Sequence, residues 1–143
     1  MKQYLISELS RKFSAKSKKQ LITCHPLLIT LFSEHIVYSW DCTILEGHRN
    51  KAAQDKYFAA GLSKLKWPNS KHNKIPSLAI DVAPYVNGKV SFDKMDCCYF
   101  AGKVMATAIY YGIYNLRWGG DWNGNGKVSD ESFQDLVHFE LVI

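Results

Sequence analysis

Residues 70–85 read Ser-Lys-His-Asn-Lys-Ile-Pro-Ser-Leu-Ala-Ile-Asp-Val-Ala-Pro-Tyr, and this stretch decides the fold. Its apolar run, residues 78–83, lies between two prolines and predicts a buried or half-buried strand. Asp81 lies inside that run, where an ionised carboxylate is costly unless it is paired, hydrogen-bonded or bound to a metal. His72 lies in the polar approach to the strand and is one candidate metal ligand.

A second histidine lies in a similar apolar segment near the C-terminus. His138 belongs to Val-His-Phe-Glu-Leu-Val, residues 137–142, which also predicts a strand. Two histidines, one carboxylate and an open fourth position make up the ligand set of a catalytic zinc site. Spacing by itself leaves an alternative, in which Asp81 is only a capped or salt-bridged residue of its strand.

The composition predicts one folded domain. The chain has 143 residues, of which 47% are apolar, and these values suit a single domain with its own core rather than a disordered chain. We expect this domain to cover residues 1–143, with residues 1–16 as a polar N-terminal extension.

The chain is basic, with 18 Lys and Arg against 13 Asp and Glu and a formal charge of +5. A basic surface favours acidic partners such as nucleic acid, anionic lipid or anionic cell-wall polymer, although a solvated N-terminal face explains the charge equally well. No basic stretch carries the aromatic and glycine pattern of a nucleic-acid-binding module, so we expect no nucleic-acid partner.

The sequence predicts neither a signal peptide nor a membrane span. Residues 1–13 lack an apolar core of signal-peptide length, and the apolar run at 27–32 is too short to cross a bilayer. We therefore expect synthesis in the cytoplasm, no stable membrane insertion, and a monomer. The four cysteines show no C-x-x-C spacing and are expected to be free thiols.

The pattern of elements predicts an α+β fold, in which helices pack on a small, mainly antiparallel sheet. The predicted helices cover residues 26–35, 51–60 and 93–111. The predicted strands cover residues 40–46, 78–83, 115–119 and 136–143. Asn87-Gly88 predicts a type I′ hairpin turn, and the polar loop 62–77 has a length that is often functional.

Residues 121–126, Asp-x-Asn-x-Asn-Gly, copy the opening of a calcium-binding loop. The candidate ligands are Asp121, Asn123 and Asn125. Ser132 stands where such a loop carries its bidentate glutamate. We therefore expect weak Ca²⁺ binding at most, and a turn-rich loop without metal is the favoured interpretation.

Four segments occur in a characteristic order along the chain. They are Glu46-Gly47-His48-Arg49, Ser70-Lys71-His72, the strand 79–85 and the C-terminal segment 135–141. Their combination, from about Ser17 to the C-terminus, resembles the phage-type peptidoglycan peptidases of the D-alanyl-D-alanine metallopeptidase (VanY-like, M15) group. One departure is that eight residues separate His72 from Asp81, more than is usual in the broader group, and the glycine usual there is absent.

The resemblance implies the hedgehog and D-Ala-D-Ala peptidase-like zinc fold, with a zinc ion held by His72, Asp81 and His138. It also implies a general base at Asp135, three residues before the last ligand. Such a base takes a proton from water and passes it to the leaving amine. The structural alternative is that Asp135 only caps the turn into the last strand.

The resemblance assigns substrate or oxyanion contacts to Arg49 and Ser70. The permanent charge of Arg49 suits a developing oxyanion or a substrate carboxylate, although an ion pair with Glu46 is the alternative. Glu140 lies two residues after His138 and faces the same side of the strand, either as a supporting residue of the site or as an ordinary polar partner.

We therefore expect a zinc peptidase that acts on peptidoglycan, cutting the L-alanyl-D-glutamate bond as a phage or prophage endolysin. It would remain in the cytoplasm of the host bacterium until released to the wall or periplasm. One alternative is a D-alanyl-D-alanine carboxypeptidase on the same fold, which would need export. Another is a non-catalytic, zinc-stabilised wall-binding module, which the presence of Asp135 disfavours.

Overall fold

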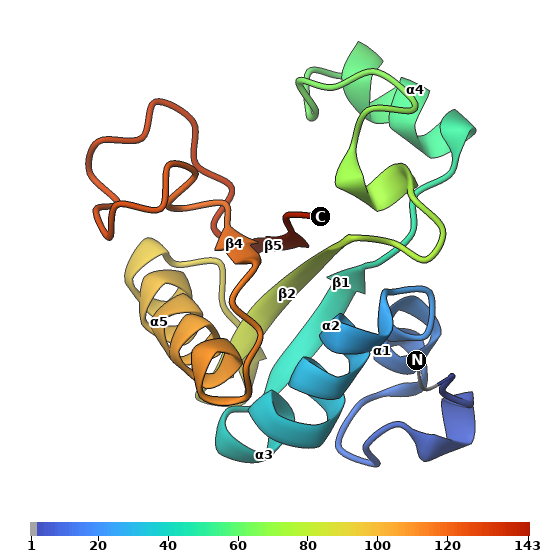
Figure 1. Ribbon diagram of the computed structural model, residues 1–143, viewed down its shortest axis with the longest axis vertical. Coiled ribbons are helices and arrows are strands. Elements are labelled where there is room, and N and C mark those ends of the chain that lie inside the picture. Colours follow the sequence, from blue (N-terminus) through green and yellow to red (C-terminus); the bar gives the residue numbers. More distant parts are fainter. Residues whose placement is uncertain (1–2) are drawn as a thin grey trace.

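A computed structural model describes residues 3–143 and places an antiparallel sheet at the centre of the molecule (Figure 1). The strand order is β1-β2-β5-β4, and the short β3 pairs with β2. The strands are β1 (Cys42–Glu46), β2 (Ala79–Val86), β3 (Lys89–Val90), β4 (Leu116–Trp118) and β5 (His138–Leu141). This arrangement confirms the predicted α+β class.

The helices pack around this sheet, with α1 against β1 and α5 against β2 and β4. The α-helices are α1 (Ala15–Leu21), α2 (Pro26–Thr30), α3 (Val37–Ser39), α4 (Lys51–Ala59) and α5 (Lys94–Tyr110). The other helical segments are η1 (Ile6–Glu8), the π-helical η2 (Leu31–Ile36) and η3 (Lys71–Asn73). No described helix combines the length and the apolar character that a bilayer crossing requires.

Local sequence signals determine where these elements begin and turn. The Asn50 side chain accepts a hydrogen bond from the Ala53 amide at 2.9 Å and caps α4. The Asp93 side chain accepts hydrogen bonds from the amides of Met95 and Asp96 and caps α5. Asn87 and Gly88 have φ angles of 52° and 76°, as a type I′ turn requires. The hairpin closed by this turn extends β2 to Val86, beyond the predicted strand end.

The two faces of the sheet differ in what they carry. On one face Phe139 packs edge-on between Phe32 of η2 and Phe100 of α5, so both helical segments cover the same face. Because side chains alternate along a strand, His138 points to the opposite face. Asp81 is the direct partner of His138 in the β2–β5 register, and its side chain therefore lies on that same face.

Two irregular segments border the end of the sheet that carries this pair. The segment 120–135 rises on one side of β5, and α4 with the following residues 60–77 rises on the other (Figure 1). Leu9 and Phe13 lie in the hydrophobic core, so the N-terminal region packs on the domain from at least Leu9 onward. All four cysteines are free thiols, as predicted.

Candidate metal centre and active site

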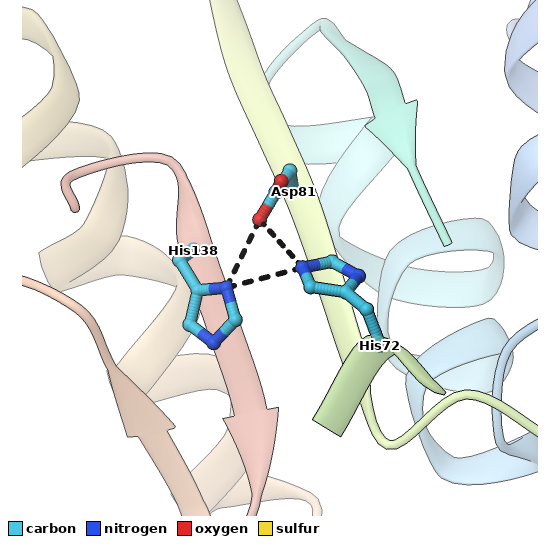
Figure 2. A group of neighbouring side chains, drawn as sticks. All are labelled: His72, Asp81 and His138. Carbon is cyan, nitrogen blue, oxygen red and sulfur yellow. Dashed lines mark hydrogen bonds and ion pairs between the residues drawn. The ribbon is translucent and has the colours of Figure 1, made fainter. Parts of the chain in front are cut away.

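Three ligand atoms predicted from the sequence meet at one point of the open sheet face (Figure 2). Asp81 Oδ1 lies 3.2 Å from His72 Nε2 and 3.1 Å from His138 Nδ1. The two histidine nitrogens lie 3.3 Å apart. The strands β2 and β5 supply Asp81 and His138, and η3 supplies His72. The structure thus brings together all three residues expected to bind zinc.

The spacing of these atoms fits a tetrahedral metal site. Ligand atoms at about 2.0–2.1 Å from a tetrahedral zinc ion are separated from one another by about 3.3 Å. The three observed separations, 3.1, 3.2 and 3.3 Å, form nearly such a triangle. A catalytic zinc ion takes three protein ligands and keeps a fourth position for water or substrate. The residues present therefore fit a catalytic zinc ion.

Hydrogen bonds determine which ring nitrogen of each histidine is free to bind a metal. His72 Nδ1 lies 2.6 Å from the carbonyl oxygen of Gly47, to which it donates, and this leaves Nε2 as the ligand atom. His138 has the opposite arrangement, because its Nε2 lies 2.9 Å from Glu140 Oε1 and its Nδ1 faces the other ligands. Both rings are thus held in the tautomer that metal binding needs.

Strong electrostatic coupling links the buried groups of the site. Burial raises the pKa of Asp81, but His72 and His138 outweigh burial and hold that pKa well below its usual range. Burial lowers the pKa of His138, but hydrogen bonds to Asp81 and Glu140 outweigh it and raise the pKa to about 9. The Asp81 carboxylate and the His138 imidazole therefore each favour the charged form of the other.

Two of the three candidate metal ligands, His72 and His138, line a cleft of about 310 Å³ between the two irregular segments. His72, His138, Arg49, Ser70 and Asp135 all line this cleft, so the structure gathers the predicted catalytic and substrate-binding residues with the ligands. Such a concave site with a few convergent polar groups is the usual form of an active site.

Asp135 lies at the edge of the ligand group. Its Oδ2 is 4.0 Å from His138 Nδ1, and 39% of its side chain is exposed to the cleft. Its backbone amide donates to the Gly119 carbonyl at 2.8 Å, which anchors the residue to the end of β4. Burial and the nearby negative charge of Asp81 raise the pKa of Asp135, and a raised pKa suits a group that takes up and returns a proton near neutrality.

Arg49 makes the ion pair that the sequence left as an alternative, and it also lines the cleft. Its guanidinium pairs with Glu46, donates to Gln54 Oε1 at 3.0 Å and lies 4.3 Å from the centre of the Tyr57 ring. These contacts hold the planar group in one orientation. Ser70 Oγ accepts a hydrogen bond from the His72 amide and stabilises the turn that carries this ligand.

Several cleft residues were missed by sequence reasoning. Trp122 lies 5.5 Å from His138 between ring centres and stacks on Phe133, and the Lys64 ammonium lies 4.4 Å from the centre of the Phe133 ring. Gln54, on an otherwise polar helix, is fully buried because it bridges Arg49 and the Leu65 carbonyl. The length of the loop 62–77 was the only sequence signal that pointed to the side of the cleft formed by Lys64 and its neighbours.

The calcium-like loop is closed by its own hydrogen bonds. The Asp121 carboxylate accepts from the amides of Asn125 and Gly126 at 3.1 and 2.9 Å. Asn123 Oδ1 accepts a further bond from the Asn125 amide, and Glu131 accepts from the amide of Asn123. These hydrogen bonds close the turns of the loop.

Two histidines and a carboxylate at a cleft, with a further carboxylate beside them, are the features of metal-dependent hydrolases. The profile of the phage L-alanyl-D-glutamate peptidase family matches residues 9–142, and the chain belongs to this family. It is 37% identical over 138 residues to the L-alanyl-D-glutamate peptidase of Escherichia phage T5, covering 94% of this chain and all of that protein.

A solved structure of a peptidase has the same fold as this chain. The L-Ala D-Glu endopeptidase ChiX of Serratia marcescens superposes with a TM-score of 0.71 at 27% sequence identity. The superposition covers 91% of this chain and 89% of that one. The resemblance inferred from the sequence motifs is thereby confirmed, and the chain is a peptidase by family membership.

Proposed function

We propose that this protein hydrolyses the bond between L-alanine and D-glutamate in peptidoglycan stem peptides, using a zinc ion held by His72, Asp81 and His138. The triangle of three donor atoms at the cleft carries the proposal. Membership of the family and the names of the two relatives support the choice of bond over terminal D-alanine.

A bound zinc ion supplies a Lewis acid and lowers the pKa of water to about 7. The residues around it supply the rest of the chemistry. Asp135 accepts the proton of the attacking water and returns it to the leaving amine of D-glutamate. The distance of 4.0 Å between Asp135 Oδ2 and His138 Nδ1, a proposed ligand atom, supports this role.

Arg49 and Ser70 orient the substrate in this proposal. The Arg49 guanidinium carries a permanent charge and makes its known contacts through only part of its five donors, so the remaining N–H groups are available to a carbonyl oxygen or a carboxylate. Ser70 lines the same wall and presents its hydroxyl next to the His72 turn. In this proposal, Arg49 and Ser70 bind the substrate and take no part in proton transfer.

We further propose that the protein acts as an endolysin, as a single domain and a monomer. It would accumulate in the cytoplasm of the host bacterium and reach the wall when the membrane is breached. Its formal charge of +5 would hold it to an anionic wall, and more weakly as salt rises. The loop with Asp121, Asn123 and Asn125 would bind Ca²⁺ weakly at most.

The test is digestion of purified sacculi, followed by mass spectrometry of the soluble and bound products. The zinc-loaded protein should release stem peptides that begin with D-glutamate and leave L-alanine on the glycan. Protein treated with a chelator should release nothing until zinc is restored. Release of free D-alanine from intact stems would instead support the carboxypeptidase, and binding without any product would support the wall-binding module.

A further inference from the structure

A row of polar contacts connects His138 to two other residues that line the cleft, Glu140 and Arg117. His138 Nε2 lies 2.9 Å from Glu140 Oε1, and the other oxygen of Glu140 lies 2.8 Å from Arg117 Nη2. Arg117 and Glu140 are direct partners in the β4–β5 register, so both side chains lie on the same sheet face as His138. Only 7% of the Glu140 side chain is exposed.

This row selects one tautomer of the His138 ring. An ionised carboxylate only accepts hydrogen bonds, so the ring nitrogen facing Glu140 must carry the proton. With a metal bound, the unprotonated nitrogen is then Nδ1, which is the atom that faces Asp81 and His72. The opposite tautomer would place a nitrogen lone pair against a buried carboxylate, which is unfavourable.

Arg117 determines the orientation of Glu140 in turn. Its guanidinium donates to the carboxylate oxygen that does not contact His138, and its Cζ atom lies 5.7 Å from the centre of the Trp122 ring. With one oxygen held by each donor, the carboxylate cannot rotate away from the imidazole. At His72 the corresponding hydrogen bond goes to the Gly47 carbonyl, 2.6 Å from Nδ1, while Glu46 Oε1 lies farther away, at 3.9 Å.

We propose that Glu140 is a positioning residue that fixes His138 as an Nδ1 metal ligand, and that Arg117 holds Glu140 in place. This inference rests on the proposed metal site and extends it by two residues. Neither residue contacts the reacting atoms through this row. Carboxylates that orient a ligating histidine contribute about 10- to 100-fold to metal affinity.

Three variants separate this role from a general contribution to folding. In Glu140→Gln, the introduced amide can offer its oxygen to His138 or to Arg117, and its NH₂ group then opposes the other donor. Arg117→Met removes one of the two donors. The double variant therefore relieves the conflict that the single Glu140→Gln change creates. Asp55→Asn, in the exposed Lys51–Asp55 pair of α4, is the matched control.

The measurement is zinc affinity, by competition with a chelating dye, on variants whose circular dichroism matches the parent. We expect Glu140→Gln to bind zinc about 10- to 100-fold more weakly, Asp55→Asn to match the parent, and the double variant to recover part of the loss. The proposal would be overturned if Glu140→Gln lost less than about twofold in zinc affinity. It would also be overturned if the loss of binding free energy in the double variant equalled the sum of the losses in the two single variants.

Nitrogen NMR of the histidine rings provides a second test that needs no variant. In the zinc-loaded parent, His138 should show a metal-bound Nδ1 and a protonated Nε2, and His72 should show the reverse. A His138 bound through Nε2 overturns the positioning role while leaving zinc binding and peptidase activity intact. A parent that binds no zinc overturns both this inference and the proposed function.

Discussion

Replacing Gly119 by alanine should disable the enzyme without touching any predicted catalytic side chain. Gly119 directly follows β4. Its backbone bonds to two residues of the proposed site: its amide donates to the His138 carbonyl, and its carbonyl accepts from the Asp135 amide, each at 2.8 Å. A Cβ atom at Gly119 would lie 2.2 Å from the carbonyl oxygen of Asp135, whereas ordinary contact begins at 3.4 Å. The two atoms would therefore have to move farther apart by roughly 1 Å or somewhat more.

The expected magnitude follows from that displacement. Moving a catalytic group by about 1 Å reduces turnover by about 10²-fold, and overpacking at a buried position destabilises the fold by about 1–3 kcal/mol. The assay is the rate of stem-peptide release from sacculi, with thermal unfolding and zinc content measured on the same samples. We expect kcat to fall by about 10²-fold in the fraction that is folded and zinc-loaded.

Gly102 provides the matched control for this change. It lies inside α5, and a Cβ atom added there meets nothing within 4 Å. Gly102→Ala should leave turnover unchanged and stabilise the helix by up to about 1 kcal/mol. A folded, zinc-loaded Gly119→Ala protein with the parent rate would refute the argument that this close approach positions Asp135.

Three further predictions concern the base, the pH dependence of metal binding and the calcium-like loop. Asp135→Asn should retain zinc and fold but lose about 10²–10⁴-fold in the rate of wall lysis; a parent-like rate would remove Asp135 from the mechanism. Without metal, the pKa of His138 is raised from 6.5 to about 9. Protonation of His138 therefore stabilises the metal-free fold fully below pH 6.5, and this stabilisation is lost as the pH rises through about 9. Zinc must displace the His138 proton, so the zinc affinity of the protein should fall about tenfold per pH unit below the His138 pKa. Calorimetry that shows a pH-independent zinc affinity would contradict the assignment of His138 as a ligand. Calcium titration of the zinc-loaded protein should show weak binding at most, and a sub-micromolar site would show that the oxygens of Asp121 exchange their amide donors for the ion.

Two of the three candidate metal ligands could be found from the sequence because they are chemically out of place. Asp81 is a carboxylate within an apolar strand, and His138 occupies a buried position in another, so each needs a partner that local structure does not supply. The hairpin at Asn87-Gly88 and the cap at Asn50 were equally accessible, because backbone conformation at these positions depends on local chemistry.

The supporting residues could not be found in this way because they depend on tertiary pairing. Arg117 meets Glu140 only through the register of β4 with β5, and the two residues are 23 positions apart in the sequence. Gln54 resembles a surface residue of a polar helix until Arg49 and the 63–65 segment close over it. Trp122 reaches His138 only through the fold of a long loop, whose course no periodic pattern predicts.

The most direct test of the account is an anomalous diffraction map, recorded at the zinc edge, from crystals of the protein grown with zinc. The account predicts one strong peak bonded to His72 Nε2, an Asp81 carboxylate oxygen and His138 Nδ1, in the cleft that also contains Asp135. Zinc bound at the Asp121 loop with the triad empty, or a peak that omits any of the three ligands, would contradict it.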